Sequence, residues 1–287
     1  MLTRFVDVQG VATRCLFSGD AKARPLLLIH GLTLTSEIWV RNIDELGKRF
    51  RVIAVDLLGH GFTKPRHGRP VGIEEKIQHL EALVNALELG RISVSGSSFG
   101  GLIAANLVLR RRVRVDHLVI NGSGSAFNTE DQLTAFVNRI HTGYRPTLVE
   151  SSPEMWRERL RGTVLDSRNV PCELLTVLPL CYAQPWAASC WDETVEAMRT
   201  PERFRPFRIL DRLEQLDVPT LVVWGRDDKG GIYESAVAAV ARMPRAQLAV
   251  FDNCAHLPML EHAEKYNTLV CDFLLSACSS HGGTPRP

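Results

Sequence analysis

Short apolar runs alternate with amphipathic stretches of helical spacing over most of this 287-residue chain. Apolar and polar positions alternate over residues 4–9 and 11–17, which predicts an antiparallel hairpin that turns at Gly10. Further strands are predicted from apolar runs at residues 25–29, 51–55, 91–94, 117–120, 219–224 and 247–251. Helical spacing is found at residues 36–39, 73–89, 102–112, 233–241 and 261–275. Strands that alternate with helices predict an α/β fold, in which a mostly parallel sheet carries helices on both faces.

The pattern changes after Gly122. Residues 125–210 contain helix-like pieces interrupted by proline, and they contain no predicted strand. We interpret this segment as a helical cap inserted over the carboxyl ends of the strands, where open α/β sheets bind ligands. The predicted organisation is therefore a core domain of residues 1–124 and 211–278, a cap of residues 125–210 and a short flexible tail of residues 279–287.

Composition narrows the possible partners. The net charge of +2 gives no reason to expect nucleic acid or an acidic membrane surface. Seven irregularly spaced cysteines without a Cys-x-x-Cys pair suggest neither a disulfide framework nor a metal site. The first residues lack a long apolar run, and no run approaches membrane-spanning length. We expect a cytoplasmic protein with reduced thiols and no membrane partner.

The strongest motif is Gly-x-Ser-x-Gly at residues 96–100, between a predicted strand and a predicted helix. This context is typical of a nucleophile elbow, where the central residue has a strained backbone and the residues two positions away must be small. Ser98 has Gly96 and Gly100 at those positions, whereas Ser97 would need the bulky Phe99. Ser98 is therefore the predicted nucleophile. The alternative is a serine- and glycine-rich turn that only caps a helix.

Four further motifs occur in order around this elbow: His30-Gly31, residues 56–61 (Asp-Leu-Leu-Gly-His-Gly), residues 224–228 (Trp-Gly-Arg-Asp-Asp) and Cys254-Ala255-His256. Each motif follows a predicted strand. With them the chain resembles the α/β-hydrolases over nearly everything except the cap. The resemblance implies the α/β-hydrolase fold and an enzyme that uses a Ser-His-Asp triad.

A serine hydroxyl needs a base within hydrogen-bond reach and an acid that orients that base. His256 follows the last predicted strand, which is where this fold supplies its histidine, and histidine exchanges protons near neutral pH. The chain order Ser, acid, His points to the loop after residues 221–224. The resemblance places the acid at Asp228, with Asp227 as the alternative. The position one strand earlier, which some relatives use, holds the neutral Asn121.

The remaining part is an oxyanion hole, which stabilises the negative charge of the transition state. The expected donors are the backbone N–H of Phe99, directly after the nucleophile, and that of Leu32, directly after His30-Gly31. These parts together predict acyl transfer to water with no metal or other cofactor.

The nearest-looking subgroups are the carboxylesterases and the meta-cleavage-product hydrolases, which split carbon–carbon bonds in 2-hydroxy-6-oxo-dienoates. Residues 98–101 and 261–267 are similar to the second subgroup. The loop after His30-Gly31 lacks its Gly-Pro-Gly run, however, and Ser97 and Leu257 stand where it usually has Asn and Trp. We therefore expect a serine hydrolase of a small, partly apolar or aromatic ester. The alternatives are the carbon–carbon hydrolase, an acyltransferase with the same triad, and a non-catalytic receptor.

Substrate contacts can be suggested only from the composition of the cap. Trp156 and Trp186 could form an apolar roof for a small-molecule substrate, although they could equally hold the cap to the core. Arg159 could bind a substrate carboxylate, although such an arginine more often lies on a solvated face. A homo-oligomer is possible.

Overall fold

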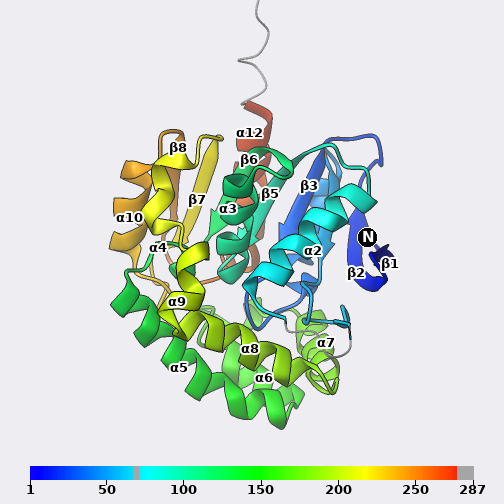
Figure 1. Ribbon diagram of the computed structural model, residues 1–287, viewed down its shortest axis with the longest axis vertical. Coiled ribbons are helices and arrows are strands. Elements are labelled where there is room, and N and C mark those ends of the chain that lie inside the picture. Colours follow the sequence, from blue (N-terminus) through cyan, green and yellow to red (C-terminus); the bar gives the residue numbers. More distant parts are fainter. Residues whose placement is uncertain (67–70, 277–287) are drawn as a thin grey trace, which may run out of the picture.

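The computed structural model describes residues 1–66 and 71–276. Its centre is an eight-stranded sheet with the order β1-β2-β4-β3-β5-β6-β7-β8 (Figure 1). The strands are β1 (Leu2–Val8), β2 (Val11–Ser18), β3 (Pro25–Ile29), β4 (Arg51–Val55), β5 (Arg91–Ser97), β6 (Arg114–Asn121), β7 (Thr220–Gly225) and β8 (Ala246–Phe251). The pairs β1–β2 and β2–β4 are antiparallel, and every other pair is parallel. The predicted mostly parallel sheet with an edge hairpin is confirmed.

The middle strands are buried on both faces, as their continuous apolar runs predict. In β3, Leu26 to Ile29 are fully buried, and Ile29 pairs with Gly96 at the end of β5. Because parallel strands end at one edge of the sheet, the loops after β3, β5, β7 and β8 converge there. Every motif identified in the sequence lies at that edge or next to it.

Helices cover both faces of the sheet (Figure 1). On one face lie α2 (Ile73–Ala86), α3 (Phe99–Arg110) and α10 (Tyr233–Arg242), and on the other α1 (Ile43–Gly47) packs against α12 (Ala263–Ser276). The predicted helix 73–89 ends earlier, at Ala86, and Glu88 has a positive φ of 51°. The predicted helix 261–275 is interrupted at His262, between α11 (Pro258–Glu261) and α12. The five-residue α1 was not predicted.

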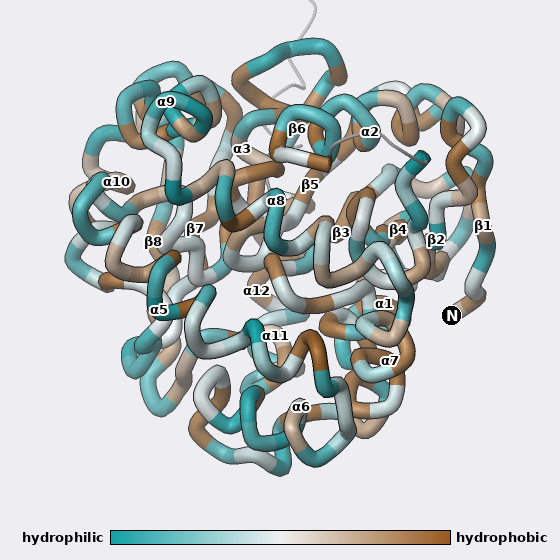
Figure 2. Tube along the Cα trace, turned by 60° about the horizontal axis from the view of Figure 1, so that its bottom comes forward, coloured by the Kyte–Doolittle hydropathy of each residue, from teal (hydrophilic) through white to brown (hydrophobic). Residues whose placement is uncertain are grey.

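Residues 125–210, which we call the cap, form helices at the carboxyl edge of the sheet (Figures 1 and 2). The helices from this region onward are α4 (Gly124–Phe127), α5 (Glu130–Val149), α6 (Pro153–Leu160), η2 (Ser167–Asn169), α7 (Cys172–Tyr182), α8 (Ala187–Arg199), α9 (Pro201–Phe204), η3 (Arg205–Phe207) and η4 (Leu210–Gln215). No strand occurs in the cap, all of which is described, as its pattern predicts. Proline lies inside two of its helices, at Pro146 and Pro179.

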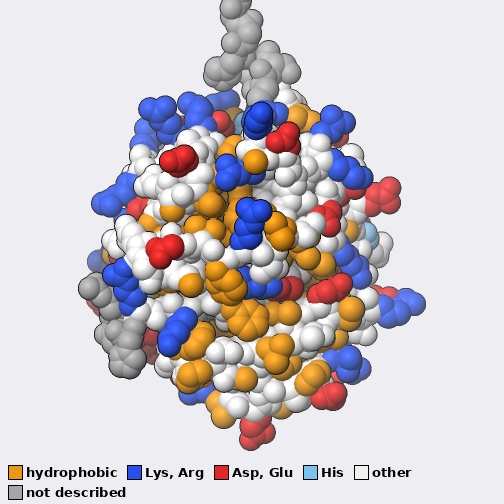
Figure 3. All heavy atoms as spheres, turned by 90° about the vertical axis from the view of Figure 1, so that its right-hand side faces the viewer, with side chains coloured by type: hydrophobic (Ala, Val, Ile, Leu, Met, Phe, Trp, Pro, Cys, Tyr) orange, Lys and Arg blue, Asp and Glu red, His pale blue; other side chains and the backbone are white. Residues whose placement is uncertain are grey.

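The edge of the sheet at β1 exposes apolar side chains. Met1, Leu2 and Phe5 are each at least half exposed. Figure 3 looks onto the side of the molecule that carries this edge and shows hydrophobic atoms gathered among charged side chains of both signs. The homo-oligomer named above as a possibility stays a prediction.

Across residues 1–66 and 71–276, no helix combines the length and the apolar character that a membrane crossing requires. The predicted flexible tail, residues 279–287, lies outside the described residues.

Candidate active site

The turn between β5 and α3 is a strained elbow. Ser98 has φ 52° and ψ −120°, which a residue with a side chain rarely adopts, and α3 begins at the next residue. A Cβ added at Gly96 would lie 2.1 Å from the carbonyl oxygen of Gly100. One added at Gly100 would lie 2.5 Å from the carbonyl oxygens of Ile29 and His30. Both neighbours must therefore be glycine, as the sequence argument required.

The two serines of the elbow have different surroundings. Ser97 is fully buried, and its hydroxyl has no hydrogen-bond partner in the described part of the chain. Ser98 is partly exposed and lines a cavity of about 380 Å³ between the strand ends and the cap. Of the two serines, only Ser98 lines the space that a substrate could occupy.

His256 and Asp228 come together from the loops after β8 and β7. Nδ1 of His256 donates a hydrogen bond of 2.8 Å to Oδ2 of Asp228, whose carboxylate is fully buried. The other oxygen, Oδ1, accepts a hydrogen bond from the backbone N–H of Gly230 at 2.6 Å. Asp227 instead accepts a hydrogen bond from the backbone N–H of Cys254 at 3.3 Å and so holds the two loops together. Of the two candidate acids, only Asp228 contacts the imidazole.

Opposing effects set the pKa of His256. Burial is the largest effect and would lower the pKa, but the charge and hydrogen bond of Asp228, together with the charge of Glu261, raise it above the ordinary value. Asp228 therefore stabilises the imidazolium, as a base that accepts a proton in the transition state requires.

Ser98 and His256 line the same cavity. Among the described residues, no hydrogen bond joins their side chains. Contacts of this kind are often long before substrate binds, so a rotation of the serine side chain is the change we expect to bring the two groups together.

Two buried histidines brace the loop after β3, which carries the predicted oxyanion donor Leu32. His30 donates through Nδ1 to the carbonyl of Gly31 at 2.7 Å, and its Nε2 accepts from the backbone N–H of Leu57 at 3.0 Å. His60 donates through Nε2 to the carbonyl of Leu32 at 2.7 Å. Burial lowers the pKa of both imidazoles, so both are neutral at pH 7. The other predicted donor is the backbone N–H of Phe99, the first residue of α3.

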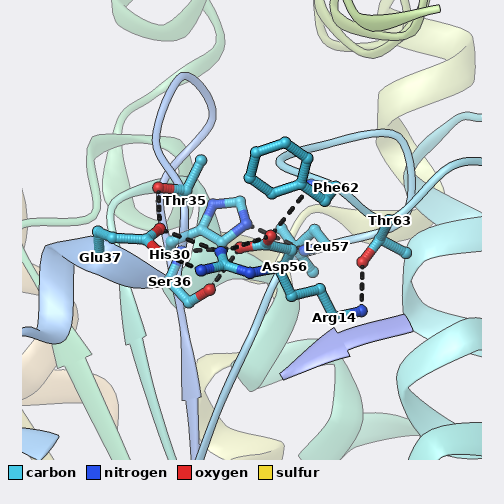
Figure 4. Close-up of polar contacts among 9 residues, drawn as sticks. All are labelled: Arg14, His30, Thr35, Ser36, Glu37, Asp56, Leu57, Phe62 and Thr63. Atoms are coloured by element: carbon cyan, nitrogen blue, oxygen red, sulfur yellow. Dashed lines mark hydrogen bonds and ion pairs between the residues drawn. The ribbon is translucent and has the colours of Figure 1, made fainter. Parts of the chain in front are cut away.

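A buried cluster of charged side chains also holds the loop after β3 in place (Figure 4). Arg14 of β2 pairs with Asp56 at 3.1 Å and with Glu37. Asp56 also accepts hydrogen bonds from the backbone N–H of Ser36 at 2.9 Å and of Phe62 at 3.1 Å. Burial alone would lower the pKa of Arg14, but its two carboxylate partners raise it, so the arginine stays charged. Sequence reasoning missed this cluster: Asp56 was noted only as part of the motif at residues 56–61, and Arg14 reads as an ordinary residue of the hairpin.

The charged side chains that line the cavity, His256 aside, are all basic: Arg139 and Arg159 from the cap and Lys229 from the loop after β7. Arg139 donates to the backbone carbonyl of Lys229 at 3.0 Å. The guanidinium of Arg159 lies 4.7 Å from the ring centroid of Tyr144 and donates to the carbonyl of Gly143. Among the described residues, no aspartate or glutamate lines the cavity. The remaining wall is mostly apolar, with Leu32, Leu34, Phe136, Ile140, Tyr144 and Leu160.

The predicted contacts from the cap are only partly placed at this cavity. Arg159 lines it, whereas Trp156 and Trp186 do not. Trp156 is fully buried, stacks on Tyr182 with ring centroids 5.0 Å apart, and donates through Nε1 to Ser151. Trp186 packs beside the apolar cluster that contains Cys190. Neither tryptophan forms a roof over this cavity: Trp156 packs inside the cap, and Trp186 is only partly buried. Arg139 and Lys229 were missed, and nothing in their local sequence marks them.

Within residues 1–66 and 71–276, no three His, Cys, Asp or Glu side chains are grouped so that they could hold a metal ion. A family model described as the alpha/beta hydrolase fold matches residues 24–263. The chain belongs to this family. This α/β-hydrolase is 31% identical over 282 residues to the 2-hydroxymuconate semialdehyde hydrolase of Pseudomonas sp. strain CF600, with 96% of the chain and 94% of that protein covered.

A second relative is the 2-hydroxy-6-oxo-2,4-heptadienoate hydrolase of Pseudomonas putida strain F1, with 30% identity over 261 residues and 87% and 88% of the two chains covered. Among solved structures, the meta-cleavage product hydrolase from Pseudomonas fluorescens IP01 superposes on the α/β-hydrolase with a TM-score of 0.75 and 27% identity, covering 96% of this chain and 98% of that one. The chain is therefore a hydrolase.

Proposed function

We propose that this hydrolase cleaves a carbon–carbon bond in an anionic dienoate of the 2-hydroxy-6-oxo type. Ser98 is the nucleophile, His256 the base and Asp228 the acid that orients it. The observation that carries the proposal is the charge of the cavity beside Ser98, which Arg139, Arg159 and Lys229 line and, within residues 1–66 and 71–276, no carboxylate does. Guanidinium groups are well suited to hold a carboxylate through paired hydrogen bonds. The relatives that are named for such dienoates agree with this charge.

The first half of the reaction breaks the carbon–carbon bond. The substrate reacts as its 2-oxo tautomer, and Ser98 Oγ attacks the C6 carbonyl while His256 takes the hydroxyl proton. The backbone N–H groups of Leu32 and Phe99 stabilise the oxyanion. When the C5–C6 bond breaks, its electron pair moves along the conjugated chain to the C2 oxygen, which takes the proton from His256. The product leaves as a 2-hydroxy-dienoate, and the acyl group stays on the serine.

The second half is ordinary deacylation. His256 takes a proton from water, the hydroxide attacks the acyl carbonyl, and the proton returns to Ser98. One water is consumed and one carboxylic acid is released. Basic side chains near C1 and C2 favour the step in which negative charge moves to that end of the substrate, because charge is stabilised most where water is partly excluded.

Hydrolysis of a small ester is the second candidate, and specific residues favour it. Ser97 and Leu257 differ from the usual residues of the dienoate hydrolases, and the loop at residues 32–35 lacks their Gly-Pro-Gly run. Leu257 is fully buried next to His256. An ester needs the same triad but no electron sink, so it would depend less on the basic wall. Acyl transfer to an alcohol would follow the same first half.

A side-by-side assay tests the choice. The catalytic efficiency, kcat/KM, would be measured for 2-hydroxy-6-oxohepta-2,4-dienoate, for its methyl ester and for p-nitrophenyl butyrate, with Ser98→Ala as the matched control. We expect the free dienoate to be the best of the three, and Ser98→Ala to lose at least about 1,000-fold. A preference for p-nitrophenyl butyrate would overturn the proposal, and an added alcohol that captured the acyl group would reveal a transferase.

A further inference from the structure

The loop that carries His256 is hydrogen-bonded directly to the cap. The backbone N–H of His256 donates to the carbonyl of Thr163 at 3.0 Å. Close by, the backbone N–H of Leu165 donates to Oε2 of Glu261 at 2.8 Å. Both cap residues lie in the segment that follows α6.

The same carboxylate also holds the histidine loop. Oε1 of Glu261 accepts a hydrogen bond from the backbone N–H of Ala255 at 2.9 Å and another from the Cys254 thiol at 3.6 Å. Burial raises the pKa of this thiol, so it remains a neutral donor. One carboxylate thus bonds the residue before His256 with one oxygen and the cap with the other.

We propose that Glu261 is a positioning residue that couples the cap to the proposed catalytic histidine. The inference rests on the proposed role of His256 as the base. When the segment 163–165 is docked, the backbone is held at Ala255 by Glu261 and at His256 by the carbonyl of Thr163. When that segment moves away, the loop loses one backbone hydrogen bond and one end of its carboxylate bridge together.

The position of the cap segment relative to the cavity gives this coupling a use. Arg159, Leu160, Gly162 and Thr163 line the cavity, and the segment continues directly to Leu165. A substrate carboxylate bound by Arg159 would therefore stabilise the docked position of the segment that holds His256. Substrate binding and correct placement of His256 then favour the same docked position of the segment 163–165. Coupling between two sites requires such a difference in affinity between two states.

Glu261 also acts on His256 by its charge. The groups that shift the pKa of this imidazole are Asp228, which bonds it, and Glu261, both of which raise the pKa against the effect of burial. A purely structural residue would leave the titration of the histidine unchanged. The pKa of His256 is therefore a readout that separates positioning from simple support of the fold.

The test compares Glu261→Gln with the wild-type enzyme and with Asp252→Asn as a matched control. Asp252 is a carboxylate at the start of the loop after β8, but its side chain is 71% exposed and pairs with Arg226. The titration of His256 would be followed by NMR of its ring protons in the free enzyme, assigned with His256→Gln. Hydrogen exchange of the amides of residues 163–165 and 254–256 would be measured in parallel. Neither readout requires a substrate.

In Glu261→Gln we expect a lower pKa for His256, faster exchange of both amide groups together, and a kcat at least about 10-fold lower with a smaller change in KM. Asp252→Asn should change none of these. Glu261→Asp keeps the charge but is one methylene too short to bridge both loops. In Glu261→Asp, His256 should therefore keep most of the upward shift of its pKa, while the amides of both segments should still exchange fast. This variant keeps the test valid if Glu261→Gln folds poorly.

An unchanged His256 titration with unchanged exchange in both variants would overturn the coupling, even if thermal stability fell. A lower pKa of His256 in Glu261→Gln, with faster amide exchange of residues 163–165 and 254–256 together, would support the coupling. This would hold even if the wild-type enzyme cleaved none of the dienoates or esters. In that case the proposed substrate would be wrong and the coupling would stand.

Discussion

Oδ2 of Asp228 lies 2.8 Å from Nδ1 of His256, and the side chain of this aspartate is fully buried. The base must be neutral to accept a proton, so activity should fall as the pH is lowered through its pKa. Because the pKa of His256 is raised, the midpoint of this fall should lie above about 6.5, the ordinary value for histidine. The measurement is kcat/KM against pH for a substrate that does not titrate in this range.

Replacement of Asp228 by Asn should remove the effect that opposes burial. The pKa of His256 should then fall, the acid limb should move to lower pH, and kcat should drop about 10,000-fold because the imidazole loses its orienting partner. Asp227→Asn is the matched control, since Asp227 bonds only backbone in the neighbouring loop. A comparable loss in Asp227→Asn would mean that the acid has been assigned to the wrong aspartate.

Arg159 should discriminate between charged and neutral substrates. Hydrogen bonds to a charged group contribute about 1.5–3 kcal/mol, so Arg159→Gln should lower kcat/KM for an anionic dienoate about 10- to 100-fold. The same change should alter kcat/KM for p-nitrophenyl butyrate only slightly. Arg157 lies on the same helix but is exposed and does not line the cavity, so Arg157→Gln is the control. Equal losses on both substrates would show that Arg159 acts only by supporting the cap.

Gly100 tests the steric argument for the elbow. Its added Cβ would lie 2.5 Å from the carbonyl oxygens of Ile29 and His30, which are backbone atoms that cannot turn aside. Overpacking of this kind costs about 1–3 kcal/mol, so Gly100→Ala should lower the free energy of unfolding by that amount and also displace Ser98. Gly162→Ala is the control, because its added Cβ meets nothing closer than 3.7 Å. Urea denaturation of both variants would reveal the difference.

The strand pattern could be predicted because this fold follows local rules. Continuous apolar runs such as Leu26–Ile29 are buried on both faces, and the glycines of the elbow follow from one close approach of backbone. The order of the motifs predicted the loop that carries the acid, and the family resemblance placed the acid at Asp228, which contacts His256. The predictions that agree with the structure are therefore those that local spacing or the family pattern determines.

The rest depends on tertiary contacts that spacing does not record. Arg14 reads as an ordinary residue of an edge hairpin, yet it is buried by Asp56 and Glu37 from two other loops. Trp156 reads as a possible ligand contact because tryptophan is common in pockets, but its partner is Tyr182 within the cap. The basic wall of the cavity combines α5, α6 and the loop after β7, and no single stretch of sequence contains it.

Lys76 should make the free energy of unfolding depend on pH, and replacing this lysine should remove that dependence. This lysine is fully buried in α2 and donates from Nζ to the carbonyl of Val71 at 2.9 Å and to Oγ1 of Thr194 in the cap at 2.8 Å. Burial lowers its pKa from 10.5 to about 7. Between those two pH values the unfolded chain holds the proton and the folded chain does not, so the free energy of unfolding should rise with pH. Below pH 7 both states hold the proton and the cost of burial is complete.

Lys76→Met should therefore be most stabilising, relative to the wild type, below pH 7, and this advantage should shrink as the pH rises towards 10. The slope that is lost cannot exceed about 1.4 kcal/mol per pH unit, the value for one proton. Oγ1 of Thr194 lies 3.3 Å from the carbonyl of Val71, so that carbonyl keeps a donor in the variant. Lys48→Met removes an exposed lysine and controls for charge alone. Urea denaturation from pH 6 to pH 10 measures all three proteins, and equal slopes in the wild type and Lys76→Met would show that the buried amine does not titrate in this range.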